Sequence, residues 1–108
     1  MTDPPVPGIS VVINTLNEEA NIGDCIDSVK GLADEIVVCD MCSNDRTAGI
    51  ATERGARIIL HPQAGFVEPA RKFAISSAQR EWVLVLDADE RMTEGLASRL
   101  KEAVREDA

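Results

Sequence analysis

The sequence predicts an α/β fold in which strands and helices alternate around a mostly parallel sheet, with helices on both faces to give three layers. Four short apolar runs, rich in β-branched residues, are separated by segments with the periodicity of amphipathic helices. These runs begin at residues 9, 34, 57 and 82, which leaves room for a helical crossover between each pair. Strands joined in this way are parallel, and their carboxyl ends meet at one edge of the sheet.

The first strand is expected over residues 9–13, where the run ISVVI leads into the polar loop NTLNEE. A helix follows, because apolar residues recur at the i, i+3, i+4 and i+7 spacing of one helix face. Lys30 and Gly31 then supply a basic last turn and a left-handed cap. The apolar face of this helix consists of Ile22, Cys25, Ile26 and Val29.

The second strand and helix repeat this pattern. Residues 34–39 predict a strand that runs straight into Asp40. The helix that follows is expected from about Arg46 to Arg54, with Asp45 as its cap and a left-handed glycine just beyond its end.

The second half of the chain continues the alternation. A short third strand is expected over residues 57–60, then a loop over residues 61–66 and a helix from about Pro69. The fourth strand, residues 82–86, is apolar throughout and is therefore expected to be buried on both faces. The last helix is expected to begin after Thr93 and to turn its apolar residues inward, namely Leu96, Leu100 and Val104.

The composition fits one globular domain. The 108 residues carry a net charge of −8, which argues against a general nucleic-acid binder and would repel an anionic ligand unless a cation offset the field. Residues 1–8 lack the pattern of a signal peptide, and their prolines favour a disordered lead-in to a domain over residues 9–108. The expected location is the cytoplasm, and peripheral attachment to the inner membrane is compatible with that expectation.

The three cysteines are expected as reduced thiols. Cys25 lies on the apolar face of a helix and Cys39 in a strand, which makes both ordinary core residues. Cys39 and Cys42 have the spacing of half a zinc site or of a redox dithiol. Because His61 is the one further soft ligand in the sequence, neither alternative is favoured.

Polar residues follow all four strands, so the carboxyl edge of the sheet is the predicted functional site. Asp87 and Asp89 follow the most apolar strand, and if strand geometry continues they point the same way. Such hard oxygen ligands suit a Mg²⁺ or Mn²⁺ ion that holds a phosphate, although a polar turn is the simpler alternative. The residues that follow the other strands are Thr15, Asn17, Glu18, Asp40, Ser43, Asp45 and His61.

In this order the motifs resemble those of a family 2 glycosyltransferase with the GT-A fold. The matching segments are ISVVINTLNEE, DEIVVCDMCSNDRT, His61-Pro62 and VLVLDADER, and the resemblance runs from Ile9 to about Ala103. The sequences of these segments are most similar to those of bacterial members that add a sugar to lipopolysaccharide core or related glycans. The resemblance implies the strand order 3-2-1-4 and a cleft for a nucleotide sugar, with a UDP-sugar as the donor.

The resemblance also implies roles for individual residues. The loop from Thr15 to Glu18 and Asp40 would hold the nucleotide base, with Asp40 accepting a hydrogen bond from a ring N–H. Asp87 would face the ribose or a metal-bound water, and Asp89 would bind a divalent cation, Mg²⁺ or Mn²⁺. The implied nucleotide-binding residues are Thr15, Asn17, Glu18, Asp40, Arg71 and Asp87.

Two positions depart from the family pattern. Cys42 stands where the family usually has glycine, so a turn that needs positive φ there would be strained by about 1 kcal/mol. Lys72 stands where asparagine is more usual.

The family places its acceptor-binding half and its catalytic base after the Asp-x-Asp segment, whereas one helix follows that segment here. The chain is therefore expected to be the donor-binding half of an enzyme that moves a sugar to a hydroxyl of a glycan or lipid-linked acceptor. By itself it would not catalyse transfer. The alternative is a nonenzymatic nucleotide-binding or assembly module. A phosphatase or receiver domain is disfavoured because its acidic motif would follow the first strand.

The strand order 3-2-1-4 makes residues 82–86 an edge strand. This strand is apolar and contains no proline or charge, so it lacks the features that prevent edge-to-edge pairing. A homo-oligomer formed through this edge is therefore expected.

Overall fold

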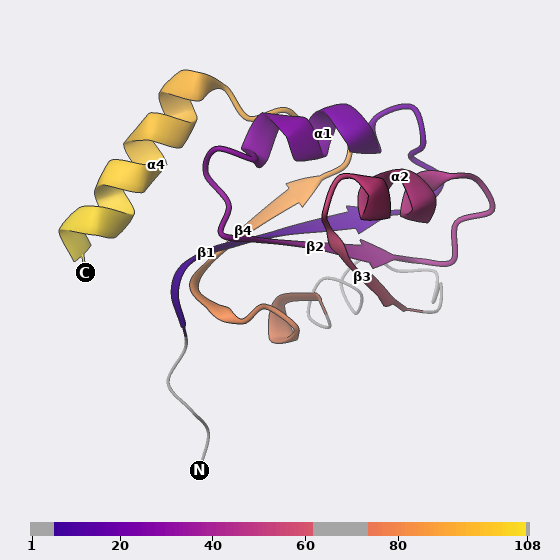
Figure 1. The fold of residues 1–108 in the computed structure, drawn as a ribbon, viewed down its shortest axis with the longest axis horizontal. Coiled ribbons are helices and arrows are strands. Elements are labelled where there is room, and N and C mark those ends of the chain that lie inside the picture. Colours follow the sequence, from indigo (N-terminus) through magenta and orange to yellow (C-terminus); the bar gives the residue numbers. More distant parts are fainter. Residues whose placement is uncertain (1–5, 62–73, 108) are drawn as a thin grey trace, which may run out of the picture.

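The computed structural model describes residues 6–61 and 74–107, in which four parallel strands form one sheet in the order β3-β2-β1-β4. The predicted α/β alternation and strand order are therefore confirmed (Figure 1). The elements are β1 (Val6–Thr15), α1 (Ile22–Val29), β2 (Glu35–Asp40), α2 (Thr47–Glu53), β3 (Arg57–Leu60), β4 (Arg80–Asp87) and α4 (Glu94–Asp107).

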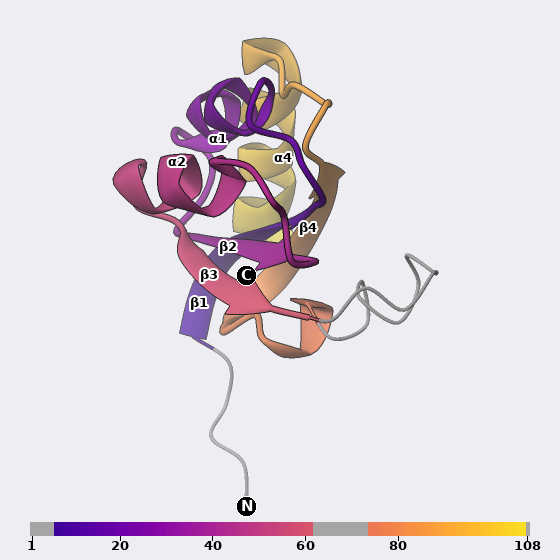
Figure 2. The same cartoon turned by 90° about the vertical axis from the view of Figure 1, so that its right-hand side faces the viewer.

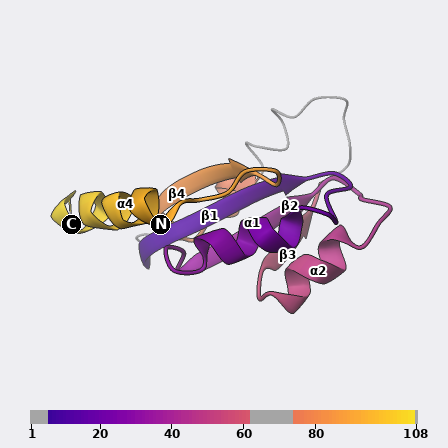
Figure 3. The same ribbon diagram turned by 90° about the horizontal axis from the view of Figure 1, so that it is seen from above.

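The core lies mainly between the sheet and α1, with α2 beside α1 on the same face (Figure 3). The predicted apolar face of α1 is fully buried against Val11 and Ile13 of β1. On the opposite face, Val12 packs with Cys39 and Ala74. Both faces of the central strand β1 are therefore covered, as the β-branched composition of that strand requires.

The cysteine predictions are confirmed for Cys25 and Cys39, whose side chains are completely buried. Burial raises the pKa of the Cys25 thiol to about 11 and also raises the pKa of Cys39. Both are therefore neutral thiols at physiological pH. Cys42, by contrast, is exposed.

The strand register brings the predicted acidic residues to the tip of β1. Thr15 is the register partner of Asp40 in β2, and Asn14 is the partner of Asp87 in β4. Asp40 and Asp87 thus end the two strands that flank β1. This placement depends on β1 lying between β2 and β4, which is visible in Figure 2.

Burial of β4 differs from the expectation. Trp82 and Val83 are 36% and 39% exposed, whereas Leu86 is 8% exposed. The prediction of burial on both faces is wrong for the first half of the strand. The reason is that β4 is the outer strand of the described sheet, so its first residues lack a neighbour on one side.

Two helix details also differ. Gly31 does not adopt the left-handed conformation expected after α1, because the chain instead turns with Leu32 and Ala33 both donating to the Val29 carbonyl. Gly55 after α2 does adopt it, with φ of 88°. Leu96 is 48% exposed rather than inward, whereas Leu100 and Val104 pack against the core as expected, together with Ala97.

Some predictions concern residues at or beyond the ends of the described segments. β1 begins at Val6, inside the expected lead-in. The loop after His61, the start of the next helix, Arg71 and Lys72 lie outside the described residues. Within the described part, none of the helices has the length and apolar character needed to span a bilayer.

Candidate functional site

A cleft of about 370 Å³ opens at the carboxyl ends of the parallel strands. We call it the C-terminal cleft. It contains three of the predicted site residues, Glu18, Asp87 and Asp89, and no basic side chain among the described residues that line it. An anionic ligand would therefore meet repulsion there unless a cation accompanied it. The lining residues are Asn14, Leu16, Glu18, Met41, Asp87, Ala88 and Asp89.

Asp40 is held beside this cleft by a nearly complete set of hydrogen bonds. Asp40 as a whole is 3% exposed. Its Oδ1 accepts from the hydroxyls of Thr15 at 3.0 Å and Ser43 at 2.5 Å, and its Oδ2 accepts from the Ser43 N–H at 3.0 Å. Since a carboxylate has about four acceptor positions, one position on Oδ2 remains for a further donor.

The turn after Asp40 confirms the sequence argument about Cys42, which has φ of 61°. This is the left-handed region, where a side chain is unfavourable. The turn lets Ser43 reach back to Asp40, so the strained residue lies inside the segment that fixes that carboxylate.

Asn17 joins the first two loops instead of entering the cleft. Its side-chain Oδ1 accepts from the Asn44 N–H at 2.7 Å, and its own N–H donates to the Ser43 hydroxyl at 2.8 Å. Its φ of 54° is left-handed, which asparagine tolerates better than most residues. Asn17 contacts the loop after Asp40 and Thr15 contacts Asp40 itself, and neither is among the described residues that line the cleft.

Glu18 combines a cleft position with a structural role. Its carbonyl accepts from Asn21 and Ile22 at the start of α1, and its N–H donates to the Thr47 hydroxyl at 2.9 Å. Asp45 also binds Thr47, through both the hydroxyl and the N–H at the start of α2, and so caps that helix as predicted. The Thr47 hydroxyl bond is the main cause of the lowered pKa of Asp45.

The strand β4 ends at Asp87, and Ala88 and Asp89 form a turn that does not continue it. The Glu90 N–H donates to the Asp87 carbonyl at 2.9 Å, and the Glu90 carboxylate accepts from the Asp87 N–H at 2.7 Å. The condition for both aspartates to point the same way as strand neighbours is therefore not met. Asp87 is half-buried and Asp89 is exposed, yet both line the cleft.

Arg91 fixes this turn to the start of α1. Its guanidinium donates to the carbonyls of Ala88 at 3.0 Å and Glu90 at 2.9 Å, and to the Asn21 side chain at 3.2 Å. Glu90 and Arg91 therefore both hold the turn that carries the exposed Asp89.

Asn14 is a cleft residue that the sequence analysis did not select. It is 6% exposed, and neither its Nδ2 nor its Oδ1 has a hydrogen-bond partner in the described structure. The usable signal in the sequence was an amide placed directly after a buried β-branched run, where an apolar residue would extend the strand.

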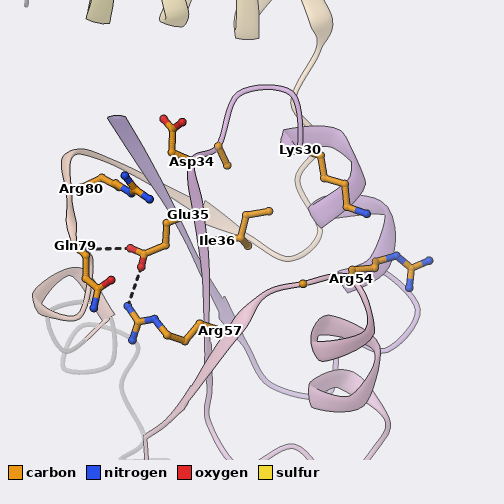
Figure 4. Close-up of a pocket in the computed structure, with 10 residues that line it drawn as sticks. Lys30, Asp34, Glu35, Ile36, Arg54, Arg57, Gln79 and Arg80 are labelled. Atoms are coloured by element: carbon orange, nitrogen blue, oxygen red, sulfur yellow. Dashed lines mark hydrogen bonds and ion pairs between the residues drawn. The ribbon is translucent and has the colours of Figure 1, made fainter. Parts of the chain in front are cut away.

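A larger hollow of about 590 Å³ lies at the opposite, amino end of the sheet (Figure 4). We call it the N-terminal hollow. None of the predicted site residues that the structure describes lines it. Figure 4 shows Glu35 bonded to Gln79 and Arg57, and the other lining residues include Lys30, Asp34, Arg54 and Arg80.

The described residues contain no group of three or more acidic, histidine or cysteine side chains arranged to hold a metal ion. A cation in the C-terminal cleft would thus take one or two oxygens from Asp87 and Asp89 and its remaining ligands from a bound anion or water. This donor set fits Mg²⁺ or Mn²⁺ shared with a diphosphate, because both ions accept carboxylate, phosphate and water oxygens.

Comparison with known proteins shows the family of this chain. The model of the glycosyl transferase family 2 matches residues 10–108. An uncharacterized glycosyltransferase of Rickettsia typhi is 42% identical over 93 residues, covering 86% of this chain and 32% of that protein. The lipopolysaccharide core biosynthesis glycosyltransferase LpsC of Rhizobium meliloti is 36% identical over 104 residues, covering 92% and 37%.

A solved structure is also similar. Glucosyl-3-phosphoglycerate synthase from Mycobacterium tuberculosis, in complex with Mn²⁺, UDP and glucosyl-3-phosphoglycerate, matches with a TM-score of 0.65 and 31% identity. The match covers 76% of this chain and 33% of that one. The chain thus spans about a third of the length of each of these two relatives and of this solved structure.

Proposed function

This chain belongs to glycosyl transferase family 2, and we propose that it binds the nucleotide-sugar donor of a glycosyltransferase. The reaction is transfer of a sugar from a UDP-sugar to an acceptor hydroxyl. The observation that carries the proposal is the cleft at the tip of β1, which Glu18, Asp87 and Asp89 line and which lies next to the end of β2 at Asp40. Support also comes from the similar mycobacterial synthase, whose complexes contain UDP and Mn²⁺.

In this proposal the base binds near Asp40. The remaining acceptor position on its Oδ2 suits the imide N–H of uracil. The segment from Thr15 to Glu18 holds Asp40 and the neighbouring loop in place, so its contribution to binding is largely through position. Arg71 is proposed to approach the nucleotide, although it lies outside the described residues.

The diphosphate binds near Asp87 and Asp89 in this proposal. Asp89 binds a divalent cation, Mg²⁺ or Mn²⁺, and Asp87 faces the ribose or a water on that cation. When bound, the cation supplies charge neutralisation to the departing diphosphate. Glu90 and Arg91 hold the turn so that the exposed Asp89 carboxylate stays at the cleft.

The acceptor is proposed to be a glycan or lipid-linked hydroxyl. Relatives are about three times as long as the matched segment, and we assign acceptor binding and the catalytic base to the remaining part of a full-length enzyme. The cytoplasmic location, with or without attachment to the inner membrane, remains a prediction.

The first test is calorimetric titration of UDP into the protein with and without Mn²⁺. We expect binding that depends on Mn²⁺ and that weakens at least about tenfold in Asp89→Ala, equivalent to about 1.4 kcal/mol. Glu102→Ala is the matched control, because it removes one exposed carboxylate from α4, away from the cleft. Absence of UDP binding to the folded wild type would overturn the proposal, and unchanged binding in Asp89→Ala would overturn the metal assignment.

The alternative is a nonenzymatic nucleotide-binding or assembly module. This alternative predicts the same titration result. It also predicts that a full-length protein carrying this segment does not release UDP from UDP-glucose. Hydrolysis or transfer by that enzyme, lost on Asp89→Ala, would favour the transferase.

Self-association through β4 is proposed separately. Trp82 and Val83 expose apolar surface on this edge strand. We expect a concentration-dependent increase in mass by light scattering that Val83→Lys reduces. A monomer at high concentration would contradict this proposal.

A further inference from the structure

The side-chain amide of Asn14 is buried and unpaired at the tip of the central strand. Its exposure is 6%, and both of its polar atoms lack partners among the described residues. Buried polar groups in folded proteins are nearly always hydrogen-bonded, because an unpaired group loses its bonds to water without replacement. The exceptions commonly mark a position where a water or a ligand supplies the missing partner.

The surroundings of Asn14 indicate which ligand that is. Asn14 lines the C-terminal cleft together with Asp87 and Asp89. It is the register partner of Asp87, and residues paired in this way on neighbouring strands share one face of the sheet, about 4.8 Å apart. Whatever binds beside the Asp87 side chain is therefore within reach of the Asn14 amide.

The donor and acceptor atoms of the amide narrow the choice of ligand group further. Nδ2 is a donor and Oδ1 an acceptor, and both are unpaired. A phosphate offers acceptors only, and a metal ion would use only the oxygen. A hydroxyl both donates and accepts, so a pair of hydroxyls can satisfy both atoms of the amide.

We propose that Asn14 binds the ribose hydroxyls of the donor nucleotide and so makes the cleft selective for ribonucleotides. This inference rests on the proposed function, because it assigns one part of the same ligand. Asn14 thereby adds a neutral group that can both donate and accept hydrogen bonds. The other polar residues that line the described part of the cleft, Glu18, Asp87 and Asp89, are carboxylates.

The test compares UDP with 2′-deoxy-UDP and 3′-deoxy-UDP, each titrated with Mn²⁺ into wild type and Asn14→Leu. We expect wild type to bind at least one deoxy analogue about five- to tenfold more weakly than UDP. In Asn14→Leu, UDP binding should fall by a similar factor and the preference for UDP should largely disappear. Gln79→Leu is the matched control, since it removes an exposed amide at the opposite end of the sheet.

Thermal unfolding separates a binding role from a structural one. Replacing an unpaired buried amide by an apolar group of similar size should leave the melting temperature of Asn14→Leu unchanged or raise it. A variant that melts higher but binds more weakly is the expected signature. A variant that keeps both UDP affinity and the preference for UDP would overturn the inference.

The outcomes also separate this inference from the proposed function. If wild type binds UDP and both deoxy analogues equally, the role of Asn14 is wrong and the donor cleft stands. This comparison needs no variant, so it remains decisive even if Asn14→Leu does not fold. If wild type binds none of the three nucleotides, the proposed function and this inference are both overturned.

Discussion

The two ends of the sheet each contain a carboxylate that accepts three hydrogen bonds, but they differ in their buried polar groups. Among the described residues, the buried side-chain atoms that lack a hydrogen-bond partner lie at the carboxyl end. At the amino end Glu35 accepts from Ser10, Gln79 and Arg57. At the carboxyl end Asp40 is bonded in a similar way, yet the amide of Asn14 has no partner in the described structure. The larger hollow, about 590 Å³ against about 370 Å³, is at the amino end. The state of the polar groups therefore indicates the binding site better than the volume does.

The amino end is organised for stability. Glu35 begins β2, Ser10 lies in β1, Arg57 begins β3, and Gln79 directly precedes β4. One carboxylate thus connects residues in or next to all four described strands. Because its partners all come from the chain itself, this network is complete without a ligand.

Among the substitutions that test this difference between the two ends of the sheet, Glu35→Ala is expected to have the largest effect on stability. The substitution leaves the buried Ser10 hydroxyl and the Gln79 N–H without their acceptor, and bonds to a charged group contribute about 1.5–3 kcal/mol. We expect the free energy of unfolding in urea to fall by about 2–3 kcal/mol. The affinity of the folded fraction for UDP with Mn²⁺ should not change.

Glu53→Ala is the control for this prediction. Glu53 is exposed and forms only a long ion pair with Arg46 at 3.9 Å, so its loss should change stability by less than about 0.5 kcal/mol. If Glu35→Ala remained folded but lost nucleotide binding, the assignment of stability to the amino end and of binding to the carboxyl end would be wrong.

Lowering the pH is expected to have a smaller effect on the stability of the fold. Burial alone would raise the pKa of Glu35, but the bonds from Gln79, Ser10 and Arg57 outweigh it and lower the pKa below its ordinary value of 4.5. The ionised carboxylate therefore stabilises the fold above about pH 4.5, and this stabilisation is lost as the pH falls through the lower folded value.

Urea unfolding between pH 3 and pH 6 measures this dependence. We expect wild type to lose stability in acid and Glu35→Gln to lose less, because the amide does not titrate. The acid dependence of stability in Asp45→Asn is the comparison at the carboxyl end. The Thr47 bonds likewise lower the pKa of Asp45, but this site is more exposed to solvent than Glu35. A steeper acid dependence for Glu35→Gln than for wild type would contradict the role assigned to this carboxylate.

The features that the sequence predicted correctly are those set by local pattern and strand order. Asp40 and Asp87 flank the tip of β1 because short apolar runs become parallel strands, and parallel strands end at one edge. Asn14 was missed because an unpaired amide is defined by the atoms around it and not by its neighbours in sequence. The exposure of Trp82 likewise depends on whether another strand lies beside β4.

The turn at Arg91 belongs to the same class of missed features. Its three acceptors are the carbonyls of Ala88 and Glu90 and the side chain of Asn21, which is remote in sequence. Local patterns cannot show that a surface arginine will reach the start of α1. The conformation at Cys42, however, could be anticipated, because a glycine-type turn imposes the same φ on whatever residue occupies it.

The smallest expected effect concerns two neighbouring residues of the carboxyl end that share a left-handed conformation. Cys42 has φ of 61° and Asn17 has φ of 54°. Glycine at position 42 removes steric strain of about 1–2 kcal/mol, but glycine also gives the unfolded chain more freedom, so the net gain should be about 0.5–1 kcal/mol. Asn17→Gly is the matched variant and should destabilise instead, since asparagine tolerates this φ and its Oδ1 accepts from the Asn44 N–H. Urea unfolding of both variants measures the difference, and a loss of stability in Cys42→Gly would show that the thiol makes a compensating contact.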